Sequence, residues 1–244
     1  MKEKIFTFWE GKMPSYIQLC MQTWKFDYVL LNYNNLHEYT DLNIKNIHGV
    51  HRNKSVYDRL KEFSLPKIAD FVRVHVLRDN GGYWLDADTI MLSDELPKEN
   101  MIGNDKTRAN TIGFLHTESH TDMYNEWSKH QDDVVFRTTL TNDETNWNVL
   151  GNLFTDNYLK FHNEITIADV TNCWAETYMI KGKTLRSVKY NQFYFEDNYK
   201  LSDLRPTNML MLHNSWTPDY YKQLTKSRVL DKDCTLSNIL REIL

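Results

Sequence analysis

The sequence is poor in cysteine, and its cysteines form no recognisable framework. Cys20, Cys173 and Cys234 are far apart, odd in number and include no C-x-x-C pair. A disulfide scaffold or a thiolate zinc site is therefore not expected. We predict thiols outside any disulfide, buried or half-buried, in a protein of a reducing compartment.

A surplus of positive charge and long apolar runs are also missing. Lys+Arg 29 against Asp+Glu 33 gives a net charge of -4, so the chain lacks the basic excess that nucleic-acid binding requires. No apolar run approaches the roughly 20 residues of a membrane-spanning helix. Residues 1–16 lack the apolar core of a secretory signal. We expect a cytoplasmic protein with no nucleic-acid partner.

Glycine and proline are scarce, with Gly 8 and Pro 5 in 244 residues, and no repeat, low-complexity stretch or linker interrupts the chain. We therefore predict one domain spanning residues 1–244.

The apolar pattern predicts an α/β fold. Residues 4–9 and 28–31 are expected to be strands, with a helix capped by Ser15 and running to about Trp24 between them. A strand–helix–strand opening is typical of a parallel sheet. Further helices are predicted over residues 55–63 and 66–80. The tail, residues 220–244, has leucines at helical spacing among basic residues, and it either packs on the core or lies on a membrane.

The helix predicted over residues 66–80 is apolar around most of its circumference, which indicates deep burial. Asp70 and Arg73 nevertheless lie on one of its faces, three residues apart. Charges in such a position are paired or functional, and the residues alone favour an internal salt bridge and a functional pair equally. Gly81 and Gly82 end this helix, and one of them can take a positive φ.

Two carboxylates follow the next apolar run. Residues 83–90 are expected to be extended, so Asp86 and Asp88, two residues apart, would point to the same side at a strand end. Hard oxygen donors of this kind suit Mg²⁺ or Mn²⁺, which complete their coordination with water and substrate phosphates. A solvated turn would carry the same D-x-D pattern, so the pattern alone is weak evidence.

The stretch KIADFVRVHVLRDNGGYWLDADTIML resembles the signature of glycosyltransferases with a DXD sugar-binding region. This group includes bacterial capsular polysaccharide synthesis transferases, the α-mannosyltransferase-like proteins of glycosyltransferase family 32 and, distantly, glucosylating toxins. The shared pattern is filled here by Ala69, Asp70, Arg73, Gly81, Gly82, Trp84, Asp86 and Asp88.

Two outlying segments also resemble that family. IFTFWEGKMPSYIQLCMQTW is similar to its opening, and MLMLHNSWTPDY to its closing His-x-x-x-Ser-Trp region. The chain departs from the pattern in three places. Thr7 stands where many relatives have histidine, Asn152 follows Gly151 where proline is common, and His213 is closer to Ser215 than usual.

The resemblance implies a single-domain GT-A fold, a Rossmann-like α/β/α sandwich with a mostly parallel sheet. Residues 1 to about 90 would bind the nucleotide sugar, and residues 91–244 would form the acceptor side and the closing region. The implied reaction moves a hexose from a UDP-sugar to a glycan or lipid-linked oligosaccharide in bacterial capsule synthesis, with retention of configuration. Such enzymes work at the cytoplasmic membrane face, which implies peripheral contact with the membrane.

The resemblance also implies roles for individual residues. Asp88 would bind Mn²⁺ or Mg²⁺ directly, Asp86 through water or by holding the sugar, and His213 as a further ligand or phosphate contact. Asp70 and Arg73 would hold the donor sugar at the reacting carbon. The remaining donor contacts would be Phe8 and Trp9 on the base, Trp84 in the donor site, and Ser215 and Trp216 over the diphosphate.

Other classes of protein share parts of this pattern. A phosphohydrolase with a D-x-D-x-T motif would need threonine where Ile90 stands. A non-catalytic carbohydrate-binding protein would use the aromatic residues and a metal without turnover. A structural α/β protein would carry the acidic pair in a solvated turn. Phe8 and Trp9 also have a second interpretation, in which they pack in the core at a strand end and do not stack on the base.

Overall fold

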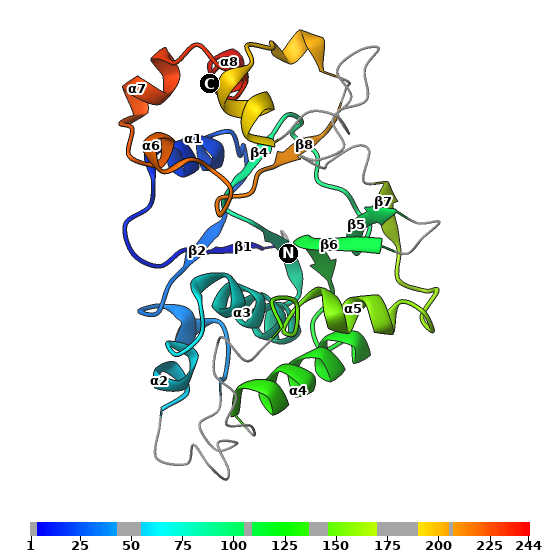
Figure 1. Ribbon diagram of the computed structural model, residues 1–244. Coiled ribbons are helices and arrows are strands. Elements are labelled where there is room, and N and C mark those ends of the chain that lie inside the picture. The colour runs from blue at the N-terminus through cyan, green and yellow to red at the C-terminus, as the bar shows by residue number, and fades with distance from the viewer. Residues whose placement is uncertain (1–3, 43–54, 105–108, 137–145, 170–189, 205–206) are drawn as a thin grey trace. The chain divides into compact units, whose positions relative to one another are not determined.

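Figure 1 shows a computed structural model of the chain, which describes residues 4–42, 55–104, 109–136, 146–169, 190–204 and 207–244. The chain divides into two compact units that alternate along the sequence. Unit 1 comprises Met1–Glu10, Tyr28–Leu85 and Lys98–Ala168, and unit 2 comprises Gly11–Asp27, Asp86–Pro97 and Asp169–Leu244. The prediction of a single domain, with a nucleotide-sugar part ending near residue 90, stays a prediction.

A six-stranded sheet of order β2-β1-β3-β6-β5-β7 forms the centre of unit 1. Its strands are β1 (Ile5–Phe8), β2 (Val29–Leu31), β3 (Gly82–Leu85), β5 (Met101–Asn104), β6 (Ala109–Thr117) and β7 (Ile167–Asp169). β1 is parallel to β2 and β3, whereas β6 is antiparallel to both β3 and β5. Strands β2, β1, β3 and β5 therefore run in one direction. The predicted α/β fold with a mostly parallel central sheet is confirmed.

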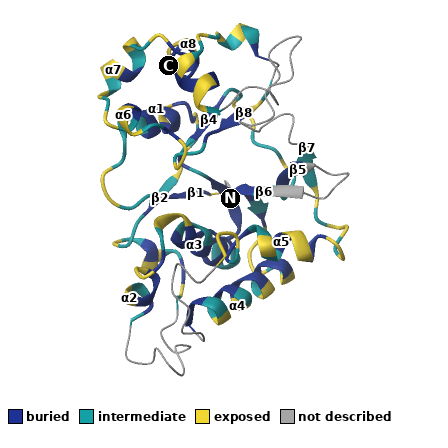
Figure 2. Cartoon of the chain, in the orientation of Figure 1, coloured by how far each residue is buried: buried dark blue, intermediate teal, exposed yellow. Residues whose placement is uncertain are grey.

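Helices cover one face of this sheet (Figure 1). They are α2 (Val56–Leu60), α3 (Leu65–Asn80), α4 (Asp122–Phe136) and α5 (Asn152–Tyr158), and a short 3₁₀ helix, η1 (Leu36–Glu38), follows β2. α3 is the most buried of them, and much of its ribbon carries the dark colour of buried residues in Figure 2. The apolar periodicity that predicted this helix also places its residues in the core of unit 1.

The junction between α3 and β3 depends on two glycines. Gly81 and Gly82 have φ values of 65° and 89°, a region that favours glycine. A Cβ on Gly81 would lie 2.6 Å from the Ser119 nitrogen, and a Cβ on Gly82 would collide with the Lys4 carbonyl oxygen. The same close approach lets the Tyr83 amide donate to Lys4 at 2.8 Å, so β3 begins directly beside β1.

Unit 2 is built on a two-stranded antiparallel sheet, β4 (Thr89–Met91) with β8 (Met209–Met211). Its helices are α1 (Ser15–Gln22), α6 (Asp219–Lys222), α7 (Lys226–Asp231) and α8 (Thr235–Ile243), with the short segments η5 (Gln192–Glu196) and η6 (Leu201–Asp203). The predicted capping role of Ser15 is wrong. Pro14 is the N-cap, and its carbonyl accepts the Gln18 amide at 3.2 Å, so Ser15 is the first helical residue.

The C-terminal tail is folded into unit 2. Leu236, Ile239 and Leu240 of α8 have no exposed surface. This burial corresponds to the core-packing alternative for residues 220–244. Within the described parts of the chain, no helix combines the length and apolarity needed to cross a bilayer.

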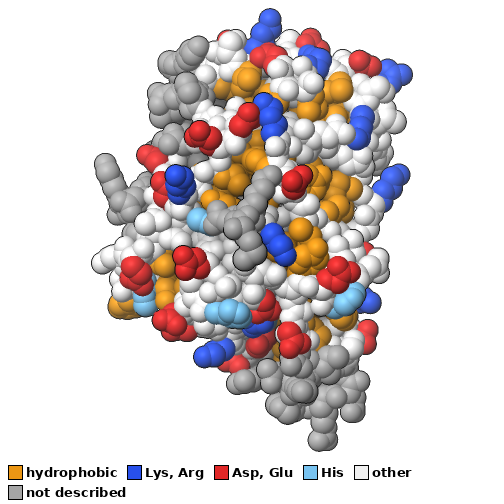
Figure 3. All heavy atoms as spheres, turned by 180° about the vertical axis from the view of Figure 1, so that it is seen from behind, with side chains coloured by type: hydrophobic (Ala, Val, Ile, Leu, Met, Phe, Trp, Pro, Cys, Tyr) orange, Lys and Arg blue, Asp and Glu red, His pale blue; other side chains and the backbone are white. Residues whose placement is uncertain are grey.

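Two of the cysteines behave as predicted. Cys20, on α1, and Cys234, before α8, are buried thiols outside any disulfide. Cys173 lies outside the described residues. On the face shown in Figure 3, acidic and basic side chains are interspersed over the described surface, which is typical of a solvated protein exterior.

Candidate functional site

The acidic pair lies in a turn between two strands. β3 ends at Leu85 and β4 begins at Thr89, whose amide donates to the Asp86 carbonyl at 3.0 Å. The expectation of a continuous extended run through Ile90 is therefore wrong. β3 and β4 pair in different sheets, so the chain has to turn between them. The predicted place of the pair at a strand end is confirmed, although a turn and not strand alternation sets the directions of the two half-buried carboxylates.

Asp88 is tied to the segment that follows β8. Its carbonyl accepts the Leu212 amide at 3.1 Å, which continues the β4–β8 ladder by one bond. Its Oδ2 accepts the Asn214 amide at 2.8 Å. The structure thus brings Asp88 together with the closing segment, which we define as residues 213–217. These are two of the three regions that the sequence analysis selected, and they are separated by more than 120 positions.

The closing segment is a tight turn. The amides of Trp216 and Thr217 donate to the His213 carbonyl at 2.9 and 3.1 Å. The His213 and Trp216 rings pack with their centroids 4.2 Å apart, and the Trp216 side chain is half exposed. Ser215 is exposed. Ser215 and Trp216 are therefore presented to solvent, while His213 lies half-buried beneath them.

Two tyrosines that the sequence analysis missed complete this arrangement. The Tyr16 hydroxyl donates to Asn214 Oδ1 at 2.5 Å, and the Tyr190 hydroxyl accepts the His213 amide at 3.0 Å. Burial first, and the Asp88 carboxylate second, raise the pKa of Tyr16. We call Tyr16, Asp88, Tyr190, His213 and Asn214 the Asp88 cluster. Tyr16 lies within the N-terminal segment that resembles the family's opening, but nothing in that segment singles it out, and Tyr190 lies in none of the selected segments, because their contacts depend on the packing of distant segments.

The Asp88 carboxylate also raises the pKa values of other buried groups of unit 2. Burial and then Asp88 raise the pKa of the Cys20 thiol. Burial also raises the pKa of Tyr190, where Asp88 adds to the rise and the hydrogen bond from the His213 amide opposes it. These phenols and the thiol therefore stay neutral at ordinary pH, and the Asp88 carboxylate acts on all three.

The carboxylates suit a hard cation. Mg²⁺ and Mn²⁺ bind through one or two carboxylates and take their other ligands from water and substrate phosphates. Asp86 and Asp88 supply oxygen donors of this kind in one turn. Among the described residues, no three His, Cys, Asp or Glu side chains are grouped closely enough to hold a metal by themselves. His213 thus does not complete a three-residue ligand set with Asp86 and Asp88 in this structure.

Asp70 and Arg73 form an ion pair in unit 1. Arg73 Nη2 lies 2.9 Å from Asp70 Oδ1, and the two side chains are 5% and 16% exposed. The guanidinium also donates to the carbonyls of Ala69 and Ile112 and lies 5.2 Å from the centroid of the Trp84 ring. The pair is therefore the internal salt bridge that the sequence analysis considered, with a carboxylate that keeps some access to solvent.

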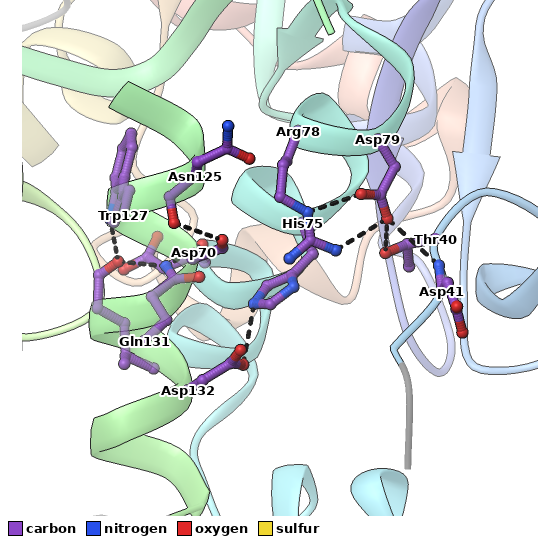
Figure 4. Close-up of polar contacts among 12 residues, drawn as sticks. Thr40, Asp41, Asp70, His75, Arg78, Asp79, Asn125, Trp127, Gln131 and Asp132 are labelled. Atoms are coloured by element: carbon purple, nitrogen blue, oxygen red, sulfur yellow. Dashed lines mark hydrogen bonds and ion pairs between the residues drawn. The ribbon is translucent and has the colours of Figure 1, made fainter. Parts of the chain in front are cut away.

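The segment before α5 packs against Asp70. Gln131 Nε2, on α4, donates to the Asp70 carbonyl at 2.9 Å and also to the Leu150 carbonyl, which accepts Trp127 Nε1 at 3.0 Å as well (Figure 4). A Cβ on the next residue, Gly151, would lie 3.1 Å from Asp70 Oδ2. The absence of a side chain at Gly151 thus allows this segment to approach the carboxylate.

Replacing Gly151 by alanine is expected to destabilise unit 1. The new methyl would collide with Ile112 Cδ1 and press on Asp70 Oδ2. Ile112 Cδ1 is the end of a flexible side chain that can move, so we expect a loss at the lower end of the about 1–3 kcal/mol typical of overpacking, and thermal unfolding would measure it. Adding Ile112→Val removes the colliding Cδ1 atom, so the double variant should regain much of the lost stability. Equal melting of Gly151→Ala and the wild type would contradict this account.

The aromatic residues assigned to the donor differ in burial. Phe8 is 6% exposed and packs edge-to-face on Tyr33 at 5.9 Å, and Trp84 is 1% exposed in the core of unit 1. This packing corresponds to the core alternative for Phe8. Trp9 is half-buried, and its indole N–H is buried with no hydrogen-bond partner among the described residues. The nucleoside role of Phe8 and Trp9 and the donor-site role of Trp84 stay predictions.

The fold is that of a mixed α/β protein with an acidic turn directly after a central strand. The chain belongs to the capsular polysaccharide synthesis protein family, whose model matches residues 1–232. The solved structure titled PaToxG Glycosyltransferase matches with a TM-score of 0.41 and 14% identity over 65% of this chain and 67% of that one. Likeness at that level bears on no residue of the site. None of the curated proteins matches the chain.

Proposed function

We propose that the protein is a metal-dependent glycosyltransferase that moves a hexose from a nucleotide sugar, a UDP-hexose, to a glycan or lipid-linked oligosaccharide. The family places the chain in capsular polysaccharide synthesis, and building such a polymer requires glycosyl transfer. The observation that carries the proposal is the Asp88 cluster, in which a carboxylate of the D-x-D turn is bonded to the closing segment.

The cluster suits a diphosphate bound through a metal. Asp88 and Asp86 would hold Mn²⁺ or Mg²⁺, and His213, which is not grouped with them closely enough to be a third ligand, would contact a phosphate. Bound there, the metal would neutralise the charge that develops on the leaving nucleotide. Ser215 and Trp216 are both exposed to solvent, and they would contact the diphosphate.

Residues of unit 1 also have proposed roles in donor recognition. Asp70 would accept hydrogen bonds from sugar hydroxyls, and Arg73, already bonded within the protein, would fix the direction of that carboxylate. Trp9 would use its buried indole N–H on the nucleoside, beside Phe8 and Trp84. We assign no covalent nucleophile. A same-face displacement, in which the leaving phosphate takes the acceptor proton, would retain configuration.

Divalent metal is expected to be required for donor binding. In a thermal-shift screen, UDP-hexoses with Mn²⁺ should raise the melting temperature, because a ligand at a hundred times its Kd adds about 2.7 kcal/mol of stability. EDTA should abolish both the shift and sugar transfer, and added Mn²⁺ should restore them. Full transfer in metal-free buffer would refute the metal-dependent proposal.

Two further assays distinguish this proposal from the other classes of protein. Ile90 has no hydroxyl to offer a phosphohydrolase site. Its side chain is fully buried in β4, where it pairs with Leu210. Hydrolysis of a generic aryl phosphate would nevertheless indicate that class. Binding of a glycan without transfer from any nucleotide sugar would indicate a non-catalytic carbohydrate-binding protein.

A further inference from the structure

We propose that Tyr16 is a positioning residue for the metal site: through Asn214 it holds the Asp88 carboxylate and the closing segment in one arrangement. This inference rests on the proposed function and deepens it. Tyr16 Oη donates to Asn214 Oδ1 at 2.5 Å, and the Asn214 amide donates to Asp88 Oδ2 at 2.8 Å. One asparagine therefore joins a buried phenol to the carboxylate of the D-x-D turn.

The helix that carries Tyr16 is fixed to the strand that follows Asp88. Trp24 Nε1, just after α1, donates to the Thr89 carbonyl at 2.8 Å. Thr23 Oγ1 accepts the Met91 amide, also at 2.8 Å. Because both ends of β4 are bonded to the C-terminal end of α1, the Tyr16 hydroxyl at the other end of the helix is held at a set distance from the D-x-D turn.

Tyr16 suits a rigid support better than a direct ligand. Its side chain has no exposed surface and packs edge-to-face on Tyr221, with ring centroids 5.8 Å apart. Its hydroxyl also lies 3.2 Å from Thr217 Oγ1, and Thr217 bonds to the His213 carbonyl, so the phenol contacts the closing segment at two points. Burial beside Asp88 keeps the phenol protonated, so its hydroxyl can donate a hydrogen bond.

Residues that bond to metal-ligating carboxylates orient those ligands, and losing one typically lowers metal affinity 10–100-fold. Tyr16→Phe removes the hydroxyl and keeps the ring. Because Tyr16 acts one residue further out, through Asn214, we expect the variant to bind Mn²⁺ about tenfold more weakly, the lower end of that range. Electron paramagnetic resonance would count unbound Mn²⁺ in titrations of the full chain, with metal alone and with metal plus UDP. Saturating Mn²⁺ should restore most of the transfer rate.

Tyr221→Phe is the matched control. It removes another buried tyrosine hydroxyl of unit 2, one that bonds to Ser237 Oγ at 2.9 Å and to no member of the Asp88 cluster. Its affinity for Mn²⁺ should equal that of the wild type. If both variants lose affinity alike, the effect reflects general destabilisation of unit 2, and the positioning role is wrong.

Asn214→Ala tests the same connection from its other end and replaces Tyr16→Phe if that variant does not fold. The double variant should bind Mn²⁺ no more weakly than the weaker single variant, because both changes remove one shared interaction. Wild-type affinity in Tyr16→Phe would overturn the positioning role and leave the proposed function intact. Absence of Mn²⁺ binding by the wild type, with and without UDP, would overturn the metal-dependent function itself and the positioning role with it.

Discussion

Asp88→Asn is expected to lower sugar transfer roughly a thousandfold, which corresponds to about 4 kcal/mol of lost transition-state stabilisation. The amide is a neutral and weaker ligand for a hard cation, so the charge that balances the metal is lost. The fold should survive, because the asparagine carbonyl can still accept the Asn214 amide that Asp88 Oδ2 accepts now. Initial rates over a range of Mn²⁺ concentrations would measure the effect.

Asp94→Asn is a control from the same segment of unit 2. Asp94 pairs with Lys25 at 2.9 Å, but both side chains are about two-thirds exposed. Exposed ion pairs contribute little to stability, so this variant should melt and react as the wild type does. If Asp88→Asn keeps full activity with an unchanged metal requirement, then Asp88 does not bind the metal.

Asp70→Asn is expected to lower transfer at least a hundredfold while leaving binding of the bare nucleotide unchanged. The amide keeps the volume of the carboxylate but loses the charge that positions the donor sugar at the reacting carbon. Arg73 retains the carbonyls of Ala69 and Ile112 and the face of Trp84, so it does not become an isolated charge. The loss of stability should therefore be smaller than the about 3–5 kcal/mol typical of a broken buried ion pair.

Asp79→Asn supplies the comparison for Asp70 within the same helix. Asp79 pairs with Arg78 at 2.6 Å, accepts the Thr40 hydroxyl and is 19% exposed, close to the 16% of Asp70 (Figure 4). The Asp79 variant should lose stability and keep its turnover per folded molecule. A melting curve, a nucleotide titration and a transfer assay on both variants would distinguish a donor-binding role of Asp70 from a structural one. If Asp70→Asn melts early and its folded fraction turns over normally, Asp70 is purely structural.

Local sequence patterns predicted the first half of the fold well. Strands β1 and β2 and helices α1 to α3 lie where hydrophobic periodicity placed them, because short-range burial determines these elements. The end of α3 at Gly81 and Gly82 was also predicted, although both glycines have a positive φ where one was expected. The end of β3 was not, because β4 pairs with β8, which lies far along the chain.

The residues of the candidate site also fall into those that the sequence could predict and those that it could not. Asp70, Arg73, Asp86 and Asp88 belong to one continuous motif and could be selected by its resemblance to a family signature. Tyr16 could not, because it meets Asn214 only through a contact spanning 198 positions. Periodicity predicts that a residue such as Tyr16 faces a core, but it does not indicate which polar group that core contains.

The alternation of the two units along the chain has a consequence for synthesis. The chain passes from one unit to the other at residues 10–11, 27–28, 85–86, 97–98 and 168–169, so neither unit is one continuous piece. Among the described residues β4 pairs with no strand other than β8, so it has no strand partner until β8 is made, since Thr89 pairs with Met211. The emerging chain therefore exposes the unpaired edge of β4 while residues 92–208 are translated, a state that favours aggregation. Slow translation or a holdase chaperone should matter more for the yield of this protein than for one whose units form in sequence order.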